Sequence, residues 1–166
     1  MTNGDFEIII EKYYNMLLNI ANKYLNDSFE SQDVVQESFL KLYRAHKVFK
    51  NDEHLKNWLI RVTINNCISV LRHNKYVRLV DNEYINNLPD TSDADKKNEE
   101  NNEIFDCVQL LNNNYKNIIV LYYYNSYDVK EISSILKISE VNVRKRLERA
   151  RKKLKSIIIE RRKNER

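Results

Sequence analysis

The chain of 166 residues contains one glycine, Gly4, and one proline, Pro89. Sheet-rich folds need both residue types in their turns, whereas both weaken the interior of a helix. Their scarcity therefore predicts an all-helical protein. Gly4 alone cannot build a glycine-rich phosphate loop, and the chain has neither a nucleophile elbow nor an HExxH sequence. We therefore do not expect an enzyme.

Cysteine and histidine are also scarce, and their positions predict no metal site. Cys67 and Cys107 are far apart, so they suggest no disulfide framework and fit a reducing cytoplasm. His46, His54 and His73 show no close ligand spacing with them. We expect no metal and no cofactor.

Long hydrophobic runs are missing as well. The N-terminus has no signal-peptide pattern, and no apolar run approaches the roughly 20 residues that span a bilayer. We expect a cytoplasmic protein that does not itself span a membrane.

Positive charge is concentrated at the C-terminal end. The formal net charge is +4, yet residues 104–166 alone carry 15 basic and 7 acidic side chains. Residues 1–71 and 72–103 are both slightly acidic. This distribution suggests a polyanionic partner for the last third only.

Three amphipathic helices are predicted in the first half of the chain. Apolar residues recur at three- and four-residue spacing between residues 6 and 24. A second helix is expected from about Glu30, and a third, strongly apolar one spans about 54–73. The inward stripe of the second helix consists of Val35, Phe39 and Leu42.

The sequence changes character from Asp81 onward. This stretch has little periodicity and many Asn, Asp and Glu residues, so it cannot bury enough apolar surface to offset its ordering entropy. We predict two small helical domains, residues 1–73 and 104–166, joined by a flexible acidic linker over 74–103.

A helix-turn-helix pattern follows in the second domain. A short helix, "SYDVKEISSIL", has Ser126 or Asp128 available as its cap, and the three residues "KIS" separate it from a basic helix that contains "VNVRKRLERARKKL". The second helix is basic, with an apolar stripe of Val143, Leu147, Ala150 and Leu154. Two amphipathic helices joined in this way are typical of DNA-binding proteins.

The basic helix offers candidate DNA-reading residues on its outer face. In a helix-turn-helix, the N-terminal half of the second helix enters the major groove, where Arg reads guanine, Asn reads adenine and Glu reads cytosine. The candidates are Asn142, Arg144, Lys145, Glu148, Arg149 and Lys152. A basic amphipathic helix is also compatible with an ordinary solvated face, or with binding to an acidic protein or a membrane.

Three segments in this order resemble a known family. They are "QDVVQESFLKLYRA", "LKNWLIRVTINNCISVLR" and "YDVKEISSILKISEVNVRKRLERARKKL". The chain resembles bacterial RNA polymerase sigma factors of the ECF (extracytoplasmic function) group, which keep the second and fourth conserved sigma regions. The resemblance implies a region-two-like helical bundle and a region-four-like helix-turn-helix domain that bind polymerase core and direct promoter recognition, DNA melting and transcription initiation.

The match has departures in the helix-turn-helix. Lys137 stands where the turn usually has glycine, and Val141 and Asn142 replace a small Gly-Thr pair common in the family.

The resemblance implies a polymerase-docking face on the second helix. The face lies opposite the buried stripe and would bind the clamp helices of the largest polymerase subunit. It consists of Asp33, Gln36, Glu37, Leu40 and Arg44. An ordinary polar helix face would explain the charges but leave Leu40 pointing outward.

The resemblance also implies that the third helix and the loop before it contact the minus-ten promoter element. Extruding a base there costs a few kcal/mol, which polar and basic side chains must offset. The implied residues are Asn51 in the loop and Lys56, Arg61, Asn65 and Asn66 on the helix. Helix-surface or cap roles stay open for the two adjacent asparagines. Trp58 falls in the apolar rhythm, so we interpret it as a core residue rather than a stacking platform.

The implied partners are RNA polymerase core, promoter DNA with the minus-thirty-five element on the basic helix, and an anti-sigma factor, which is common in the group. Two alternatives remain. One is a helix-turn-helix regulator that acts without polymerase, which would leave the N-terminal helices without a role. The other is a protein-only adaptor whose basic helix binds an acidic partner.

Overall fold

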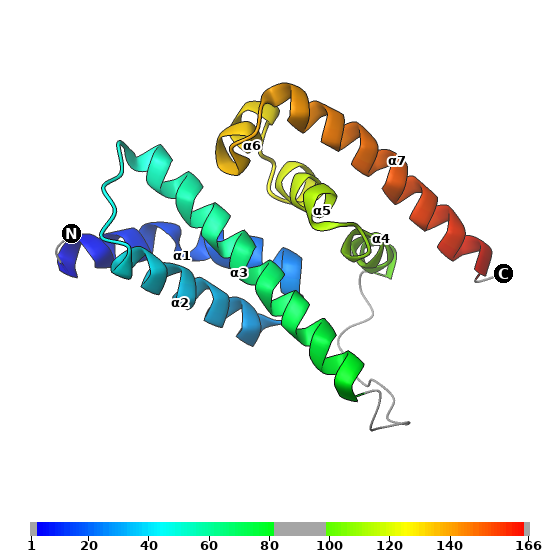
Figure 1. The fold of residues 1–166 in the computed structure, drawn as a ribbon, viewed down its shortest axis with the longest axis horizontal. Coiled ribbons are helices and arrows are strands. Elements are labelled where there is room, and N and C mark those ends of the chain that lie inside the picture. The colour runs from blue at the N-terminus through cyan, green and yellow to red at the C-terminus, as the bar shows by residue number, and fades with distance from the viewer. Residues whose placement is uncertain (1–2, 82–98, 165–166) are drawn as a thin grey trace.

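The computed structural model describes residues 3–81 and 99–164, and within these ranges the chain forms helices and no strand. Two helical groups lie next to each other (Figure 1). The first contains α1 (Asn3–Leu25), α2 (Ser28–Arg44) and α3 (Asp52–Asp81). The second contains α4 (Glu99–Gln109), α5 (Asn113–Ile119), the π-helix η1 (Val120–Tyr124), α6 (Val129–Leu136) and α7 (Glu140–Asn164). The predicted all-helical fold is confirmed.

The first group is a three-helix bundle. The Asp27 carboxylate accepts a hydrogen bond from the Glu30 amide at 2.9 Å, which satisfies one of the free N–H groups at the start of α2. The predicted stripe of α2 is buried between α1 and α3, with Val35 fully inaccessible. Tyr13, Leu17, Ile20 and Tyr24 form the facing stripe of α1.

The third helix is longer than predicted. It begins at Asp52, where the Asn51 side chain accepts a hydrogen bond from the His54 amide at 2.8 Å. The apolar pattern predicts an end near His73, but α3 continues to Asp81. Residues 74–81 contain no glycine or proline, so nothing in them stops a helix that is already formed. Residues 82–98 of the predicted linker lie outside the described residues.

The second group contains the predicted helix-turn-helix. Asp128, rather than Ser126, caps α6. Its carboxylate accepts from the Glu131 amide at 2.8 Å, while the Glu131 carboxylate accepts from the Asp128 amide at 2.9 Å. Three residues separate α6 from α7, as predicted, and the Ser139 hydroxyl accepts from the Asn142 amide at 3.2 Å. Val143, Leu147 and Ala150 are buried and Leu154 is half-buried against the core, which confirms the inward stripe of α7.

The two groups touch along a seam. α1 contacts η1 and α3 contacts α6, and the buried apolar side chains of both groups form one cluster. Among the described helices, none combines the length and the apolar character needed to cross a membrane.

Candidate polymerase-docking and DNA-binding surfaces

The five residues predicted for polymerase docking share one outward face of α2. Asp33, Gln36, Leu40 and Arg44 are exposed, and Glu37 is half-buried. Leu40 retains 44% of its accessible surface although it is a large apolar residue. Arg44 Nη1 and Glu37 Oε1 are 3.9 Å apart, so their ion pair is loose and solvated. The face is therefore charged, with a leucine at its centre.

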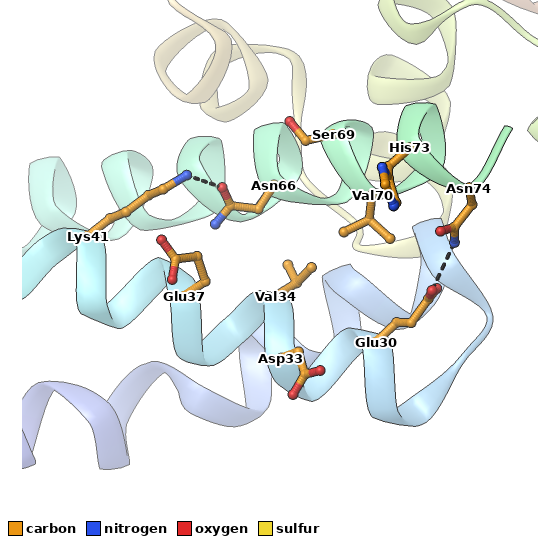
Figure 2. A pocket seen from close by; sticks show the side chains of 10 residues that line it. All are labelled: Glu30, Asp33, Val34, Glu37, Lys41, Asn66, Ser69, Val70, His73 and Asn74. Carbon is orange, nitrogen blue, oxygen red and sulfur yellow. Dashed lines mark hydrogen bonds between the residues drawn. The ribbon is translucent and has the colours of Figure 1, made fainter. Parts of the chain in front are cut away.

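A groove of about 550 Å³ runs between α2 and α3 beside this face (Figure 2). We call it the α2–α3 groove; Glu30, Asp33, Val34, Glu37 and Lys41 line it from α2, and Asn66, Ser69, Val70, His73 and Asn74 line it from α3. Asn74 donates a hydrogen bond to Glu30 at 2.8 Å and closes one end. Three carboxylates stand along its α2 side, with two valines between the helices.

The sequence does not indicate that α3 lines this groove, because the resemblance implies only DNA contacts for the polar residues of the third helix. A spacing signal was present, since residues 66, 69, 70, 73 and 74 of the third helix recur at three- and four-residue intervals. What the sequence lacked was the pairing of that face with α2.

Asn66 belongs to a buried polar network between α2 and α3. Asn66 is 7% exposed. Its side-chain oxygen Oδ1 accepts a hydrogen bond from Lys41 Nζ, and its side-chain Nδ2 donates to Ser38 Oγ at 3.0 Å. Ser38 Oγ also accepts from Thr63 Oγ1 at 3.1 Å. Asn65 instead is exposed, so the structure does not bring the two asparagines to one surface.

The remaining minus-ten candidates have different surroundings. The Asn51 side chain caps α3 and is exposed, whereas Lys56 and Arg61 are half-buried beneath the second domain. Arg61 Nη1 donates to the Ile135 carbonyl oxygen at 3.0 Å, and burial lowers the pKa of Arg61 below its ordinary value. Lys56 Nζ lies 5.3 Å from the centre of the Tyr127 ring. The five candidates thus do not form one open surface in this arrangement.

Trp58 lies at the edge of the core. It is half-buried, and its ring meets that of Phe49 edge-on at 5.6 Å between centroids. Phe49 also contacts His54 in the same way. This packing agrees with the interpretation of Trp58 as a core residue, and Lys47 Nζ lies 5.9 Å from the centre of its ring.

The predicted DNA-reading residues share the exposed face of α7: Asn142, Arg144, Lys145, Glu148, Arg149 and Lys152. Arg144 pairs with Glu140 at 3.0 Å and Lys152 with Glu148 at 2.8 Å. The hydrogen bond from Lys152 holds the pKa of Glu148 below its ordinary value. Lys145 and Arg149 make no ion pair with any residue that the structure describes. Two unpaired cations thus stand in the part of the helix that would enter a groove.

A second, mostly apolar groove of about 380 Å³ lies between η1 and the C-terminal half of α7. It is lined by Ile119, Tyr123, Arg151, Leu154, Lys155, Ile158, Ile159 and Arg162. Arg151 Nε donates to the Tyr123 hydroxyl at 2.6 Å. Sequence reasoning missed this groove, although the isoleucine run at 157–159 directly after the basic helix was a visible signal.

A helical bundle joined to a helix-turn-helix domain with an exposed cationic second helix defines a DNA-binding transcription protein. Two family models match the chain, Sigma-70 region 2 over residues 9–76 and Sigma-70 region 4 over residues 101–154. The first match covers most of α1 to α3, and the second covers the helix-turn-helix.

Two curated relatives align with this chain over most of their own length. The ECF RNA polymerase sigma factor SigM of Bacillus subtilis is 29% identical over 154 residues, which cover 89% of this chain and 94% of SigM. The sigma factor SigV of the same organism is 28% identical over 133 residues, covering 80% of this chain and 78% of SigV.

Two solved structures share the fold. The sigma factor RpoE of Bartonella quintana, in complex with the anti-sigma factor NepR, matches this chain with a TM-score of 0.66 at 17% identity. The match covers 93% of this chain and 96% of the RpoE chain. CnrH, in complex with the cytosolic domain of CnrY, has a TM-score of 0.67 at 21% identity, with coverage of 95% and 89%.

The chain belongs to the sigma-70 family and is an ECF RNA polymerase sigma factor, which acts in promoter recognition and transcription initiation. Sigma factors are in general non-enzymatic regulators of initiation, and their partners are RNA polymerase and promoter DNA.

Proposed function

We propose that three surfaces of this chain divide the work of promoter recognition. The docking face of α2 binds the clamp helices of the largest polymerase subunit. Asn51, Lys56, Arg61 and Asn65 meet the minus-ten element, and the outer face of α7 reads the minus-thirty-five duplex. The observation that carries the proposal is the exposed cationic face of α7, which stands over a buried apolar stripe.

The chemistry of α7 supports base reading in its first half and phosphate contact further along. Lys145 and Arg149 are exposed and unpaired within the described chain, so binding them to DNA breaks no existing ion pair. Arg144 is already held by Glu140 and must exchange that partner for DNA. An exposed pair of this kind contributes at most about 1 kcal/mol, so the exchange is inexpensive.

The docking face is supported by its composition and by the groove beside it. A leucine within a charged and amide-bearing face suits a polar interface with one apolar anchor. Asp33 and Glu37 belong to both the face and the α2–α3 groove. The carboxylates therefore favour a partner surface that carries lysine or arginine side chains.

Asn66 is given a different role in this proposal. Because its amide is used in the network that joins α2 to α3, it holds the two helices in register rather than touching DNA. The predicted linker over 74–103 would let both domains act on one promoter, so that two weak contacts reinforce each other.

An anti-sigma factor is the proposed regulatory partner. RpoE and CnrH are described in complex with NepR and with the cytosolic domain of CnrY, respectively. In this chain the α2–α3 groove adjoins the docking face, so an inhibitor seated there would compete with polymerase. We propose that the protein acts in the cytoplasm, where bacterial polymerase and its promoters are found, and that it catalyses no reaction of its own.

Substitution of Arg149 tests the assignment of α7. A promoter is first selected from a random template library by run-off transcription with core polymerase and the full chain. Arg149→Ala should weaken upstream-element binding by about 1–3 kcal/mol, because a lost Arg–base contact costs this much. Arg162→Ala removes the same charge from the far end of α7 and serves as the matched control.

The expected result is that run-off transcription and duplex affinity fall for Arg149→Ala and stay near the wild-type level for Arg162→Ala. Equal transcription by both variants would overturn the assignment of Arg149. Tight duplex binding without any complex between the chain and core polymerase would instead favour a regulator that acts alone.

A further inference from the structure

An apolar side chain stands in the middle of the DNA-reading face of α7. Val141 is 56% exposed although it is a large apolar residue. Residues i, i+4 and i+7 of a helix lie on one face, so Val141 shares its face with Lys145 and Glu148. The buried stripe that begins at Val143 lies on the opposite side of the helix. Val141 therefore points outward, together with the residues proposed to read bases.

The folding of the chain gives no reason for an exposed valine at this position. Val141 is not among the side chains that form the buried cluster of the described chain or pack against it. Valine is also a weak helix former, because its β-branched side chain loses rotamer freedom in a helix. The other exposed residues between positions 140 and 152 are all polar or charged. Packing and helix propensity therefore both leave this valine unexplained.

The first turn of α7 is held firmly, so the position of Val141 is well defined. Ser139 Oγ accepts a hydrogen bond from the Asn142 amide at 3.2 Å, and the Ser139 carbonyl oxygen accepts from the Val143 amide at 3.0 Å. Val143 is fully buried and anchors the same turn to the domain. In a helix-turn-helix, the N-terminal residues of the second helix contact base edges in the major groove. Val141 would then face bases.

The major groove offers one apolar target to such a side chain. Most groups on its base edges donate or accept hydrogen bonds, whereas thymine projects a 5-methyl group into the groove. A valine packed on that methyl group removes apolar surface of both partners from water, which is favourable. Lys145 and Glu148 on the same face carry charged ends that suit polar base edges instead.

We propose that Val141 is a specificity-determining residue that packs on the 5-methyl group of one thymine in the upstream duplex element. This assignment rests on the proposed function, in which the outer face of α7 reads that duplex, and it adds one apolar contact to the polar ones. Val141 is also a position at which the chain departs from the small pair common in its family, so the contact is particular to this sequence.

Deoxyuridine tests the contact directly, because uracil lacks only the 5-methyl group and keeps the pairing and the hydrogen-bonding edges of thymine. Each thymine in the upstream element of the library-selected promoter is replaced singly by deoxyuridine. Duplex affinity is then measured for the full wild-type chain, for Val141→Ala and for the matched control Val77→Ala, which shortens an exposed valine on α3. Circular dichroism checks the helicity of each variant.

We expect one deoxyuridine substitution to weaken binding by the wild type and by Val77→Ala about three- to fourfold, the loss that corresponds to one buried methyl group. Val141→Ala should bind the thymine duplex weakly to a similar degree and lose nothing more on the deoxyuridine duplex. The two changes remove the same contact, so their effects should not add. Val141→Ala should keep its helicity, because alanine is the stronger helix former.

Three results would overturn the inference. The selected element could contain no thymine on either strand, the wild type could tolerate every deoxyuridine, or Val141→Ala could lose as much affinity as the wild type at each one. Arg149→Ala separates these failures from failure of the proposed function. If Arg149→Ala weakens duplex binding, α7 still reads the element and only the thymine contact falls. If neither α7 variant alters duplex affinity, the proposed role of α7 falls with it.

Discussion

Neighbouring residues of α3 have unrelated environments although the sequence offers them as one pair. Asn65 is exposed on the outer side of the helix, whereas the Asn66 amide is inserted between α2 and α3. Consecutive residues of a helix point about 100° apart, so one can face solvent while the next faces a neighbouring helix. A pair of identical side chains in sequence therefore does not define a pair in function.

Lys137 gives a test at the same scale. It ends α6 with φ 55° and ψ 45°, a left-handed conformation that costs a residue with a Cβ atom roughly 1–2 kcal/mol. Lys137→Gly should therefore raise the free energy of unfolding by about 1 kcal/mol, measured by urea denaturation. Lys137→Ala keeps the Cβ atom and should give no such gain. A glycine variant that is no more stable than the alanine variant would contradict the cost assigned to this turn.

At the scale of elements, α2 has two working sides. One packs Val35, Phe39 and Leu42 into the bundle, and the other presents the proposed docking face. Substitutions on the outer side should change binding without changing the fold, because the side chains there contribute little to packing.

Charge reversal on the outer side of α2 tests this separation. Asp33→Lys with Glu37→Lys should weaken association with core polymerase by about tenfold or more, because like charges would then face a basic partner. Affinity is measured by titrating labelled core with the full chain. Glu7→Lys with Glu11→Lys makes the same change at the same spacing on α1, where both residues are exposed. If the α2 variant is normally helical and binds core polymerase as tightly as the wild type, these residues do not form the docking face.

The sequence predicted the elements better than the contacts between them. The stripe of α7, the Asp128 cap and the three-residue turn all follow from local spacing, and the structure confirms them. The predicted end of α3 near His73 was wrong, because residues 74–81 contain no glycine or proline to stop the helix and still include Tyr76, Val77, Leu79 and Val80. The α2–α3 groove and the surroundings of Arg61 depend on which helices pair, and local spacing carries no such information.

At the scale of the whole molecule, the two helical groups share one buried cluster although the family models treat them as separate regions. Tyr24 links them, since its ring is buried in the bundle while its hydroxyl bonds to Asn117. The stability of the folded chain should therefore respond to the ionisation of groups near the seam.

Alkaline pH gives the corresponding test. Burial raises the pKa of Tyr24 well above its ordinary value and raises the pKa of Cys67 to about 12. The unfolded chain loses these protons at lower pH than the folded chain, so stability is fully present below about pH 9 and falls as pH rises toward 12. Urea denaturation at a series of pH values should show this decline. Cys67→Ala should make it shallower, and an unaltered slope would contradict the burial of that thiol.

One contact at the seam has a genetic consequence. The acceptor for Arg61 is a main-chain oxygen at Ile135, and every amino acid supplies one at that position. Side-chain replacements at 135 therefore keep the acceptor itself. A mutational scan confined to α6 would therefore miss this contact between the two helical groups, which a change at Arg61 would remove.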